Sequence, residues 1–563
     1  MAKSWRDKSY EVLPALSVRG PELRLSMRTV TVAGMYAAAW MACVSGSHVK
    51  IFARMLGFND FAFGLMSAAP FLATSGQLFA TVVIERTGLR KYQFIQCMTL
   101  SRLLWLAVAA IPFVLPFPST LAVAAMLVVL VAIWSSGSLA EPAWFSWMGD
   151  LIPRRVRGRY LGMRSRLMSV VGLLTAVVIG VMLDQVAVKG APETYDAQPV
   201  LMWVICAILV AAAVFGVTDI LLFRRIREVK PTTRDEPPPP PLVDVAAPPQ
   251  DQRTFVRMSA YRARYLGAIV SQLLVGPMRD RVFRHYVLYG ATLAFAVSVG
   301  GWYFWLNALD NLGFSKLGAN VLFLAVGSIS GIASSRLWGR LVDRWGHKPV
   351  LMIATVGTML SALPWLLVTR QTGAPAFVIS ALNWLPRQIG AMLGYGRVLW
   401  ITGQTPIGAY LAGTVGCLIG GACWTGVNLT QVGVMMGFAG GQGRSKYVAA
   451  SAVVTGIGGV LGGLAGGTLA QSLAYLQQSP IILGPFLWNN WHACIALSIT
   501  ARSAGLFWLV GMPETRAVRI REVVRDMRLN VYNAVATRLF YPLRVFGWAR
   551  RPRGRQDDRG QDK

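Results

Sequence analysis

The chain has 563 residues, of which 54% are hydrophobic and only 14% are charged. A soluble protein carries about a quarter charged residues, so the composition excludes an ordinary soluble enzyme or binding domain. The net charge of +30 does not indicate nucleic-acid binding, because Lys and Arg are concentrated in alternate loops, as the positive-inside rule requires of a membrane protein.

Twelve apolar runs are long enough to cross a membrane, since a helix needs about 20 residues to span roughly 30 Å of hydrocarbon. The predicted spans are 29–52, 60–84, 92–114, 119–147, 162–186, 200–223, 285–308, 315–337, 349–369, 407–437, 447–472 and 490–511. We therefore expect an all-α polytopic membrane protein with twelve transmembrane helices in two six-helix bundles. The alternating basic loops predict that both termini are cytoplasmic, and no cleavable signal peptide is expected.

The two bundles are flanked and joined by polar segments. The expected parts are a cytoplasmic tail at 1–28, a first bundle at 29–223, a cytoplasmic linker at 224–284, a second bundle at 285–511 and a basic cytoplasmic tail at 512–563. The linker holds an unbroken proline run from Pro237 to Pro241, which favours an extended chain. A basic amphipathic stretch then follows. We expect this stretch and the C-terminal tail to bind anionic lipids of the inner leaflet, and solvated tails are the alternative.

The two halves share an internal repeat. Leu56-Gly57-Phe58 recurs as Leu312-Gly313-Phe314, and Tyr160 recurs as Tyr447 with a larger offset. The difference in offset implies an insertion in the second half, which we assign to 380–406 and expect to be an external re-entrant or surface helix. Two similar halves are the physical basis of alternating access, with a substrate bound between them near the midplane.

The loop between the eighth and ninth predicted spans carries a family resemblance. It reads Gly339-Arg340-Leu341-Val342-Asp343-Arg344-Trp345-Gly346-His347-Lys348-Pro349. This sequence resembles the cytoplasmic signature loop G-x-L-x-D-R-x-G of the major facilitator superfamily, and the stretch from Pro142 to Asp150 resembles a bacterial branch of that family. The resemblance implies a monomeric secondary transporter of a small solute in the bacterial cytoplasmic membrane, working without a cofactor. The alternatives are a transporter-like sensor or scaffold, and a membrane-embedded enzyme.

The same loop is predicted to be a conformational latch, and an ordinary positive-inside turn is the alternative. Gly346 permits a tight reversal between antiparallel helices. Asp343 can accept hydrogen bonds from helix N-terminal N–H groups or from an arginine. The predicted latch residues are Gly339, Asp343, Arg344, Gly346 and Lys348, with Glu85, Arg86, Gly88 and Arg90 in a first-half copy.

Charged residues inside a bilayer are costly and are therefore functional candidates. When Lys and Arg near the ends of the spans are counted with the adjoining loops, only Arg102 and Arg502 are assigned to the interior of spans. Arg102 and Glu141 should lie at similar depth on neighbouring helices, so we predict an ion pair between them. Its role is either structural or in proton coupling.

In the family that the loop resembles, the first, fourth, seventh and tenth helices line the substrate cavity. The resemblance implies these cavity candidates: His48, Trp134, Ser138, Glu141, Trp302, Tyr303, Trp305, Asn428 and Gln431. Arg102 on the third span is a coupling candidate through its predicted pair with Glu141. The aromatic run from Gly301 to Trp305 suits sugars, drugs or other amphipathic solutes, although Trp and Tyr also occupy membrane interfaces. His48 either titrates during transport or forms an interhelical hydrogen bond.

Two further patterns concern packing and metal binding. The glycines from Gly456 to Gly467 do not have the spacing of a nucleotide-binding loop, and they predict close helix packing. The six cysteines form no C-x-x-C pair and the four histidines have no metal-ligand spacing, so neither a metal nor a cofactor is expected.

Overall fold

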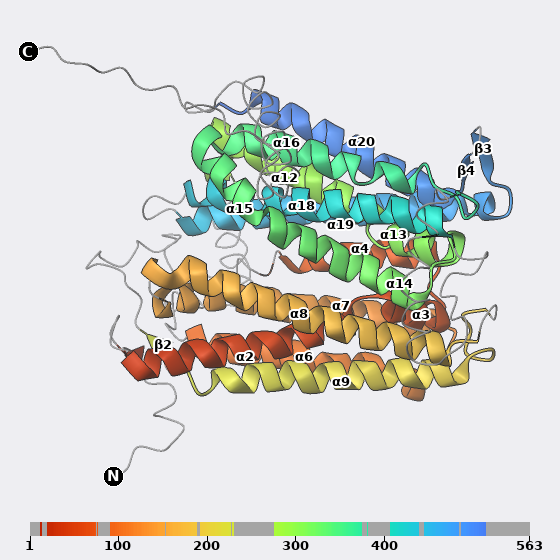
Figure 1. The fold of residues 1–563 in the computed structure, drawn as a ribbon, viewed down its shortest axis with the longest axis horizontal. Helices are drawn as coiled ribbons and strands as arrows, with labels where there is room; N and C mark the ends of the chain where they lie inside the picture. The colour runs from red at the N-terminus through yellow and green to blue at the C-terminus, as the bar shows by residue number, and fades with distance from the viewer. Residues whose placement is uncertain are drawn as a thin grey trace, which may run out of the picture.

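The computed structural model describes residues 12–13, 20–74, 76, 90–152, 154–188, 192–226, 228–229, 275–373, 380, 406–437, 444–483 and 486–513. Long helices run side by side in two groups, the first half of the chain in red to yellow and the second in green to blue (Figure 1). The predicted insertion at 380–406, most of the linker and most of the C-terminal tail lie outside the described residues.

The first half contains seven described helices and two short strands. These are β1 (Val12–Leu13), α2 (Gly20–Val44), α3 (Ser47–Leu56), α4 (Asp60–Thr74), α6 (Arg90–Val114), α7 (Thr120–Leu151), α8 (Arg154–Val186), α9 (Pro199–Phe223) and β2 (Glu228–Val229). β1 pairs with β2 in parallel, which joins the segment before α2 to the segment after α9. Arg90 lies beside the buried carboxylate of Glu228, 3.9 Å away, so the start of α6 is anchored at the same place.

The second half repeats this arrangement with more interruptions. Its helices are α11 (Gly276–Met278), α12 (Arg281–Gly300), α13 (Tyr303–Leu306), α14 (Lys316–Asn320), α15 (Gly327–Trp345), α16 (His347–Leu360), α18 (Ile407–Gly437), α19 (Arg444–Ser472) and α20 (Asn490–Gly511). Short π-helical or 3-10 segments are η3 (Asn307–Asn311), η4 (Val321–Val326), η5 (Leu363–Trp365) and η6 (Ala474–Gln477), and a hairpin is formed by β3 (Ile481–Leu483) and β4 (Phe486–Trp488).

Each predicted span overlaps one described helix or several consecutive ones, and residues 77–84 of the second span lie outside the described residues. Within the described residues, nine helices are long and apolar enough to cross a membrane, and the bent pair α2–α3 makes a tenth. The shorter α4 and α16 occupy the remaining two positions. α18 and α20 have the predicted bounds, whereas α2 and α8 begin earlier than predicted. The apolar run marks only the part inside hydrocarbon, and the helices continue into the interface.

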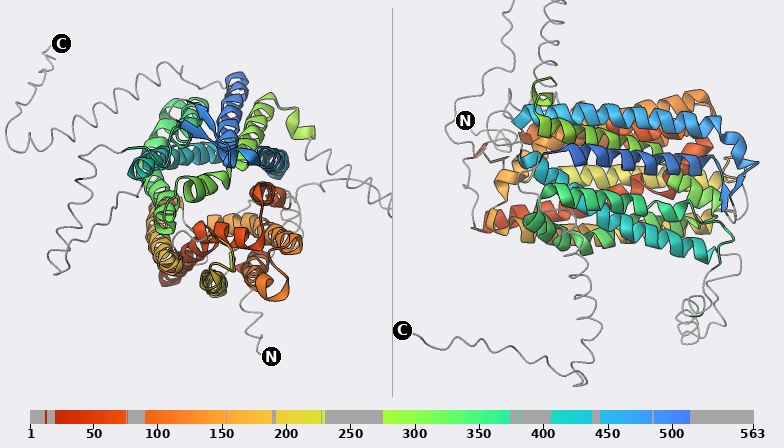
Figure 2. Two further views of the ribbon diagram at one scale, coloured as in Figure 1. Left: turned by 90° about the vertical axis from the view of Figure 1, so that its right-hand side faces the viewer. Right: turned by 90° about the horizontal axis from the view of Figure 1, so that it is seen from above.

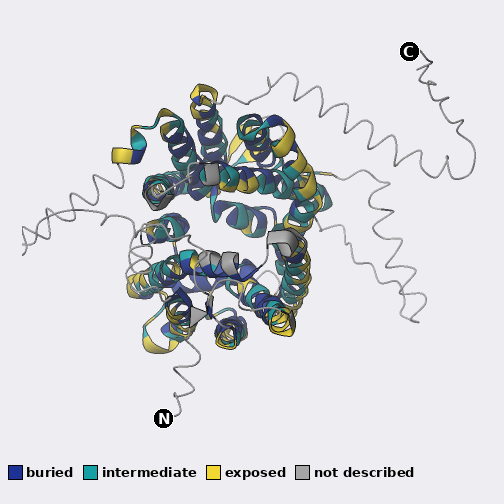
Figure 3. Cartoon of the chain, turned by 90° about the vertical axis from the view of Figure 1, so that its left-hand side faces the viewer, coloured by how far each residue is buried: buried dark blue, intermediate teal, exposed yellow. Residues whose placement is uncertain are grey.

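The two ends of the bundle differ, and we name them by position. The proximal end is where α2 begins and α20 ends; the distal end carries α3, α14 and the β3–β4 hairpin, at the right of Figure 1. Figure 2 shows the distal end face-on in its left panel and the parallel helices from above in its right panel. Figure 3 shows the proximal end, with exposed residues mostly on the outer surface.

The first helix of each half is broken near its distal end. α2 and α3 meet at a bend of 42° at Gly46, whose φ of 130° favours glycine. α12 and α13 are separated at Gly301, at the matching place in the repeat. Both short distal segments contact the other half, α3 through the Ser47 N–H and the buried Lys50 side chain and α13 through the Tyr303 hydroxyl.

The glycine run on α19 packs closely against helices from both halves, as predicted. A Cβ at Gly458 would lie 2.3 Å from the carbonyl oxygen of Ala291 on α12. A Cβ at Gly463 would lie 2.6 Å from the Cβ of Ala68 on α4. α19 therefore joins the first half to the second through backbone contact that larger residues would prevent.

The hydrophobic core is continuous at the distal end and divided at the proximal end. One distal cluster contains Phe63 and Trp105 from the first half together with Tyr303, Leu306 and Trp491 from the second. Near the proximal end the clusters are separate, one around Trp147 in the first half and one around Trp345 in the second. The two halves are therefore packed together distally and part proximally.

Candidate functional site

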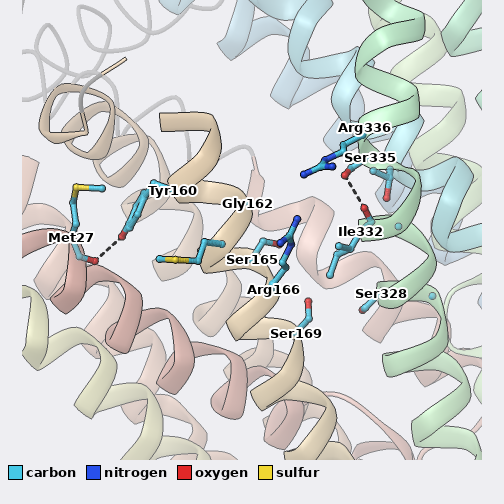
Figure 4. Close-up of a pocket in the computed structure, with 14 residues that line it drawn as sticks. Met27, Tyr160, Gly162, Ser165, Arg166, Ser169, Ser328, Ile332, Ser335 and Arg336 are labelled. Atoms are coloured by element: carbon cyan, nitrogen blue, oxygen red, sulfur yellow. Dashed lines mark hydrogen bonds between the residues drawn. The ribbon is translucent and has the colours of Figure 1, made fainter. Parts of the chain in front are cut away.

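A cavity of about 1060 Å³ lies where the two halves part. Its lining comes from α2 and α8 of the first half and from α15 and α18 of the second. α8 packs against α14 and η4 at the distal end, and the cavity begins where α8 and α15 diverge, as the close-up in Figure 4 shows. A cavity shared by both halves is the expected position of a transported solute.

Small polar side chains give this cavity its character. Ser165 and Ser169 line it from α8, and Ser328 and Ser335 from α15. The Ser335 hydroxyl donates its proton to the carbonyl of Ile332 (2.8 Å), so its oxygen stays available to a ligand only as an acceptor.

Tyr160 closes one wall of the cavity beside α2. Its hydroxyl donates to the carbonyl oxygen of Met27 (2.8 Å), and it receives a bond from Thr31 (3.2 Å). This contact fixes the spacing of α2 and α8 at the proximal end.

Two arginines enter the cavity from opposite halves. Arg166 extends from α8 and Arg336 from α15, with the two guanidinium groups directed toward each other (Figure 4). Both side chains are exposed, and neither forms a hydrogen bond or ion pair through its guanidinium with any described residue. Two residues away, Arg164 instead lies over the Trp144 ring and donates to the carbonyl of Val30 (3.3 Å).

The distal end is held closed by a buried cation. Lys50 on α3 is fully buried and donates to Glu193 (2.6 Å) in its own half. It also forms an ion pair with Asp310, which belongs to the second half. This ion pair crosses the interface between the halves and can exist only while the distal end is closed.

A helix N-terminus adds to the distal closure. The carboxylate of Asp184 on α8 accepts from the backbone N–H groups of Lys316 (2.9 Å) and Leu317 (3.0 Å) at the start of α14. These N–H groups have no partner within their own helix, and the negative charge suits the positive end of the helix dipole. Nearby, the N–H of Ser47 donates to the Asn320 side chain across the same interface (2.9 Å).

A third distal contact centres on the buried carboxylate of Asp60 on α4. Its oxygens accept from Arg54 (2.8 Å) in the first half and from Asn490 (2.6 Å) and Gln477 (2.9 Å) in the second. The Tyr303 hydroxyl donates to the Asp60 backbone carbonyl (2.9 Å). The polar contacts between halves are thus concentrated at the distal end.

The predicted ion pair between Arg102 and Glu141 is wrong. Arg102 lies 3.6 Å from Asp219 on α9, and its guanidinium carbon stacks 3.3 Å from the Trp40 ring centroid. Gly216, one turn before Asp219, leaves room for the arginine's alkyl chain. Depth alone suggested Glu141, but the rotation of α6 turns Arg102 toward α9, and Glu141 is exposed.

The assignment of only Arg102 and Arg502 to span interiors is also wrong. Arg164, Arg166 and Arg336 lie well inside α8 and α15, although their basic neighbours made them resemble loop charges. Arg502 donates to the Thr358 carbonyl and lies 5.6 Å from the Trp424 ring centroid.

None of the ten predicted cavity or coupling candidates belongs to the cavity lining. His48 is buried and bonds to the Cys43 carbonyl (2.7 Å). Trp302 and Tyr303 contact α4, while Trp305 packs 4.5 Å from Phe323. The remaining candidates are exposed (Trp134, Asn428) or half-buried (Ser138, Gln431). Asn428 is one helical turn from Thr425, which does line the cavity.

Sequence reasoning missed the lining helices α8 and α15. The available signal was the spacing of small polar residues at three, four or seven positions, as in Ser165 and Ser169 or Ser328 and Ser335. Each pair falls on one helix face with an arginine beside it.

The signature loop has the predicted turn. Gly346 links α15 to α16 with a φ of 83°, which confirms the need for glycine. Lys348 donates to the carbonyls of Val510 (2.9 Å) and Met512 (2.6 Å) at the end of α20. Asp343 is exposed and makes no hydrogen bond or ion pair in the described part of the chain. Its latch role stays a prediction, and Glu85, Arg86 and Gly88 lie outside the described residues.

Comparison with known proteins gives consistent results. The sequence profile of the Major Facilitator Superfamily matches residues 29–416. The fold is similar to the nucleoside transporter NupG (TM-score 0.50, 11% identity, 87% of this chain and 100% of that chain). It is similar to the inward-open xylose transporter XylE from E. coli (TM-score 0.50, 12% identity, 89% and 99%). A POT family transporter in complex with 5-aminolevulinic acid has a TM-score of 0.50 and 14% identity (90% and 99%). No curated protein sequence matches the chain.

Proposed function

Because the chain belongs to the major facilitator superfamily, we propose that it is a secondary transporter that moves a small solute between its two halves by alternating access. The structure corresponds to the state that is closed distally and open proximally. The observation that carries this proposal is the core, which is continuous between the halves at the distal end and divided around the cavity at the proximal end.

We infer that the proximal end faces the cytoplasm of a bacterial cell. The concentration of Lys and Arg in the segments assigned to that side supports this orientation. The structure then represents an inward-open carrier in the cytoplasmic membrane. Its basic linker and tail would lie against anionic lipids of the inner leaflet.

Thiol labelling of two matched serines tests alternating access. In a variant without the six native cysteines, Ser169→Cys places a thiol in the cavity and Ser47→Cys places one in the buried distal interface. A membrane-impermeant maleimide applied from the proximal side should label Ser169→Cys rapidly. Applied from the distal side, it should label Ser47→Cys slowly, because that position is exposed only when the halves exchange their arrangement.

Breaking the distal closure tests whether the accessibilities of the two ends change in opposite directions. Asp310→Asn removes the ion pair across the interface and should speed distal labelling of Ser47→Cys while slowing proximal labelling of Ser169→Cys. If the two rates change independently, or if no distal labelling occurs in any variant, the protein does not alternate. Ligand binding without such exchange would identify a sensor.

A further inference from the structure

We propose that the cavity binds an organic anion, with its carboxylate or phosphate group held between Arg166 and Arg336. This inference rests on the proposed transport function, for which it names the substrate class. The two arginines extend into one cavity from opposite halves of the protein (Figure 4). Guanidinium groups bind carboxylates and phosphates through two parallel hydrogen bonds, a geometry that neutral solutes do not use.

Both arginines are deep within their helices. Arg166 is twelve residues from the start of α8 and Arg336 is nine residues from the end of α15, or about 18 Å and about 14 Å at 1.5 Å per residue. α8 has 33 residues, so it is about 20 Å longer than a hydrocarbon layer of roughly 30 Å. Both arginines thus lie more than two helical turns from the proximal helix ends, within the cavity and away from the basic loops.

Every other described arginine or lysine at such depth has a partner. Arg102 pairs with Asp219, Lys50 with Glu193 and Asp310, and Arg502 with a backbone carbonyl. Arg166 and Arg336 have no such partner among the described residues, and no Asp or Glu is among the described residues that line the cavity. Unpaired cations inside a membrane protein are costly unless a water-filled path or a ligand compensates them.

The direction of the side chains separates a binding site from simple positive-inside charges. An arginine that serves only to orient the protein in the membrane would extend toward the proximal surface. Instead the two guanidinium groups approach each other across the cavity, where they repel. An anion between them replaces repulsion with two attractive contacts, and the hydroxyl of Ser169 can donate a further hydrogen bond to it.

The placement of one arginine on each half has a mechanical consequence. Without an anion, their repulsion keeps the proximal end open; with one bound, both halves are drawn toward the same group. A ligand shifts a conformational equilibrium by its differential affinity for the two states. The anion should therefore favour closure of the proximal end.

Thermal unfolding of the full-length protein in phosphatidylcholine nanodiscs tests this inference without relying on transport. The probes are inorganic phosphate, succinate and glucose 6-phosphate at constant ionic strength, with glucose and putrescine as neutral and cationic comparators. At least one anion should raise the unfolding temperature of the natural protein. Arg166→Gln and Arg336→Gln should each weaken its apparent affinity by tenfold or more, because hydrogen bonds between charged partners are lost.

Three controls make the result decisive. Arg284→Gln removes an exposed arginine at the proximal end of α12, outside the cavity, and should leave the anion effect unchanged. Arg336→Lys keeps the positive charge but loses the two parallel hydrogen bonds of the guanidinium group, so it should give intermediate affinity. This variant still tests the site if a glutamine variant fails to fold. Nanodiscs with added phosphatidylglycerol show whether a lipid headgroup supplies the anion: stabilisation by this lipid alone, lost in Arg166→Gln, assigns the site to lipid.

The inference is overturned if no anion or anionic lipid stabilises the protein, or if a variant that carries both Arg166→Gln and Arg336→Gln responds as the natural protein does. Failure of the anion-binding inference can be distinguished from failure of the transport proposal. A carrier for another solute would still exchange the labelling of Ser47→Cys and Ser169→Cys, whereas an anion-binding protein that does not transport would show stabilisation without that exchange.

Discussion

Asp184 offers the clearest quantitative test of distal closure. Asp184→Asn keeps the shape of the side chain but leaves one accepting oxygen where the carboxylate accepts from both Lys316 and Leu317. Hydrogen bonds to charged groups contribute about 1.5–3 kcal/mol each, and half-burial of Asp184 favours the lower part of this range. We expect a loss of about 2 kcal/mol from the closed distal interface, or about 30-fold in the equilibrium for its opening.

Hydrogen–deuterium exchange measures this opening without added cysteines. Peptides covering 315–326 include the N–H groups at the start of α14, and their exchange in nanodiscs should be about 30-fold faster in Asp184→Asn. Asp196→Asn is the matched control, since it removes the same charge from an exposed site at the same end. Equal exchange in Asp184→Asn and the natural protein would refute the view that this carboxylate holds the halves together.

Two further predictions concern packing within each half. Arg102→Leu or Asp219→Leu alone should cost about 3–5 kcal/mol of stability, because each leaves a buried unpaired charge. The variant with both substitutions should lose less stability than the sum of the two single losses. Additive losses in thermal unfolding would contradict the ion pair. Gly421→Ala should destabilise by about 1–3 kcal/mol, because its Cβ would lie 2.0 Å from the carbonyl oxygen of Gly327. At Gly162 an added Cβ would meet open space, so the free energy of unfolding of Gly162→Ala should lie within about 0.5 kcal/mol of that of the natural protein. A similar loss of stability in Gly421→Ala and Gly162→Ala would disprove the steric explanation.

The elements that hydropathy controls could be predicted from the sequence. In lipid, each spanning segment must form its backbone hydrogen bonds internally, so the helices at 407–437 and 490–511 follow from their apolar runs. The close packing of α19 and the turn at Gly346 also follow from residue type, because only glycine permits them.

The site could not be predicted in the same way, because it depends on how each helix is rotated about its axis. Depth along the chain suggested Glu141 as the partner of Arg102, but rotation selected Asp219. Arg166 and Arg336 were counted with neighbouring loop charges, since a sequence does not reveal that α8 and α15 diverge and leave a cavity between them. Contacts between the halves depend on the conformational state as well as on the sequence.

The matched breaks in the first helix of each half divide it into a long rod and a short cap. Ser47 and Lys50 lie on one cap and Tyr303 on the other, so both caps carry contacts that seal the distal end. Each cap can pivot about a few backbone dihedral angles at Gly46 or Gly301 while its rod stays packed in its own bundle. The distal closure is therefore made by a pair of short hinged caps, and its opening can begin before either bundle moves as a whole.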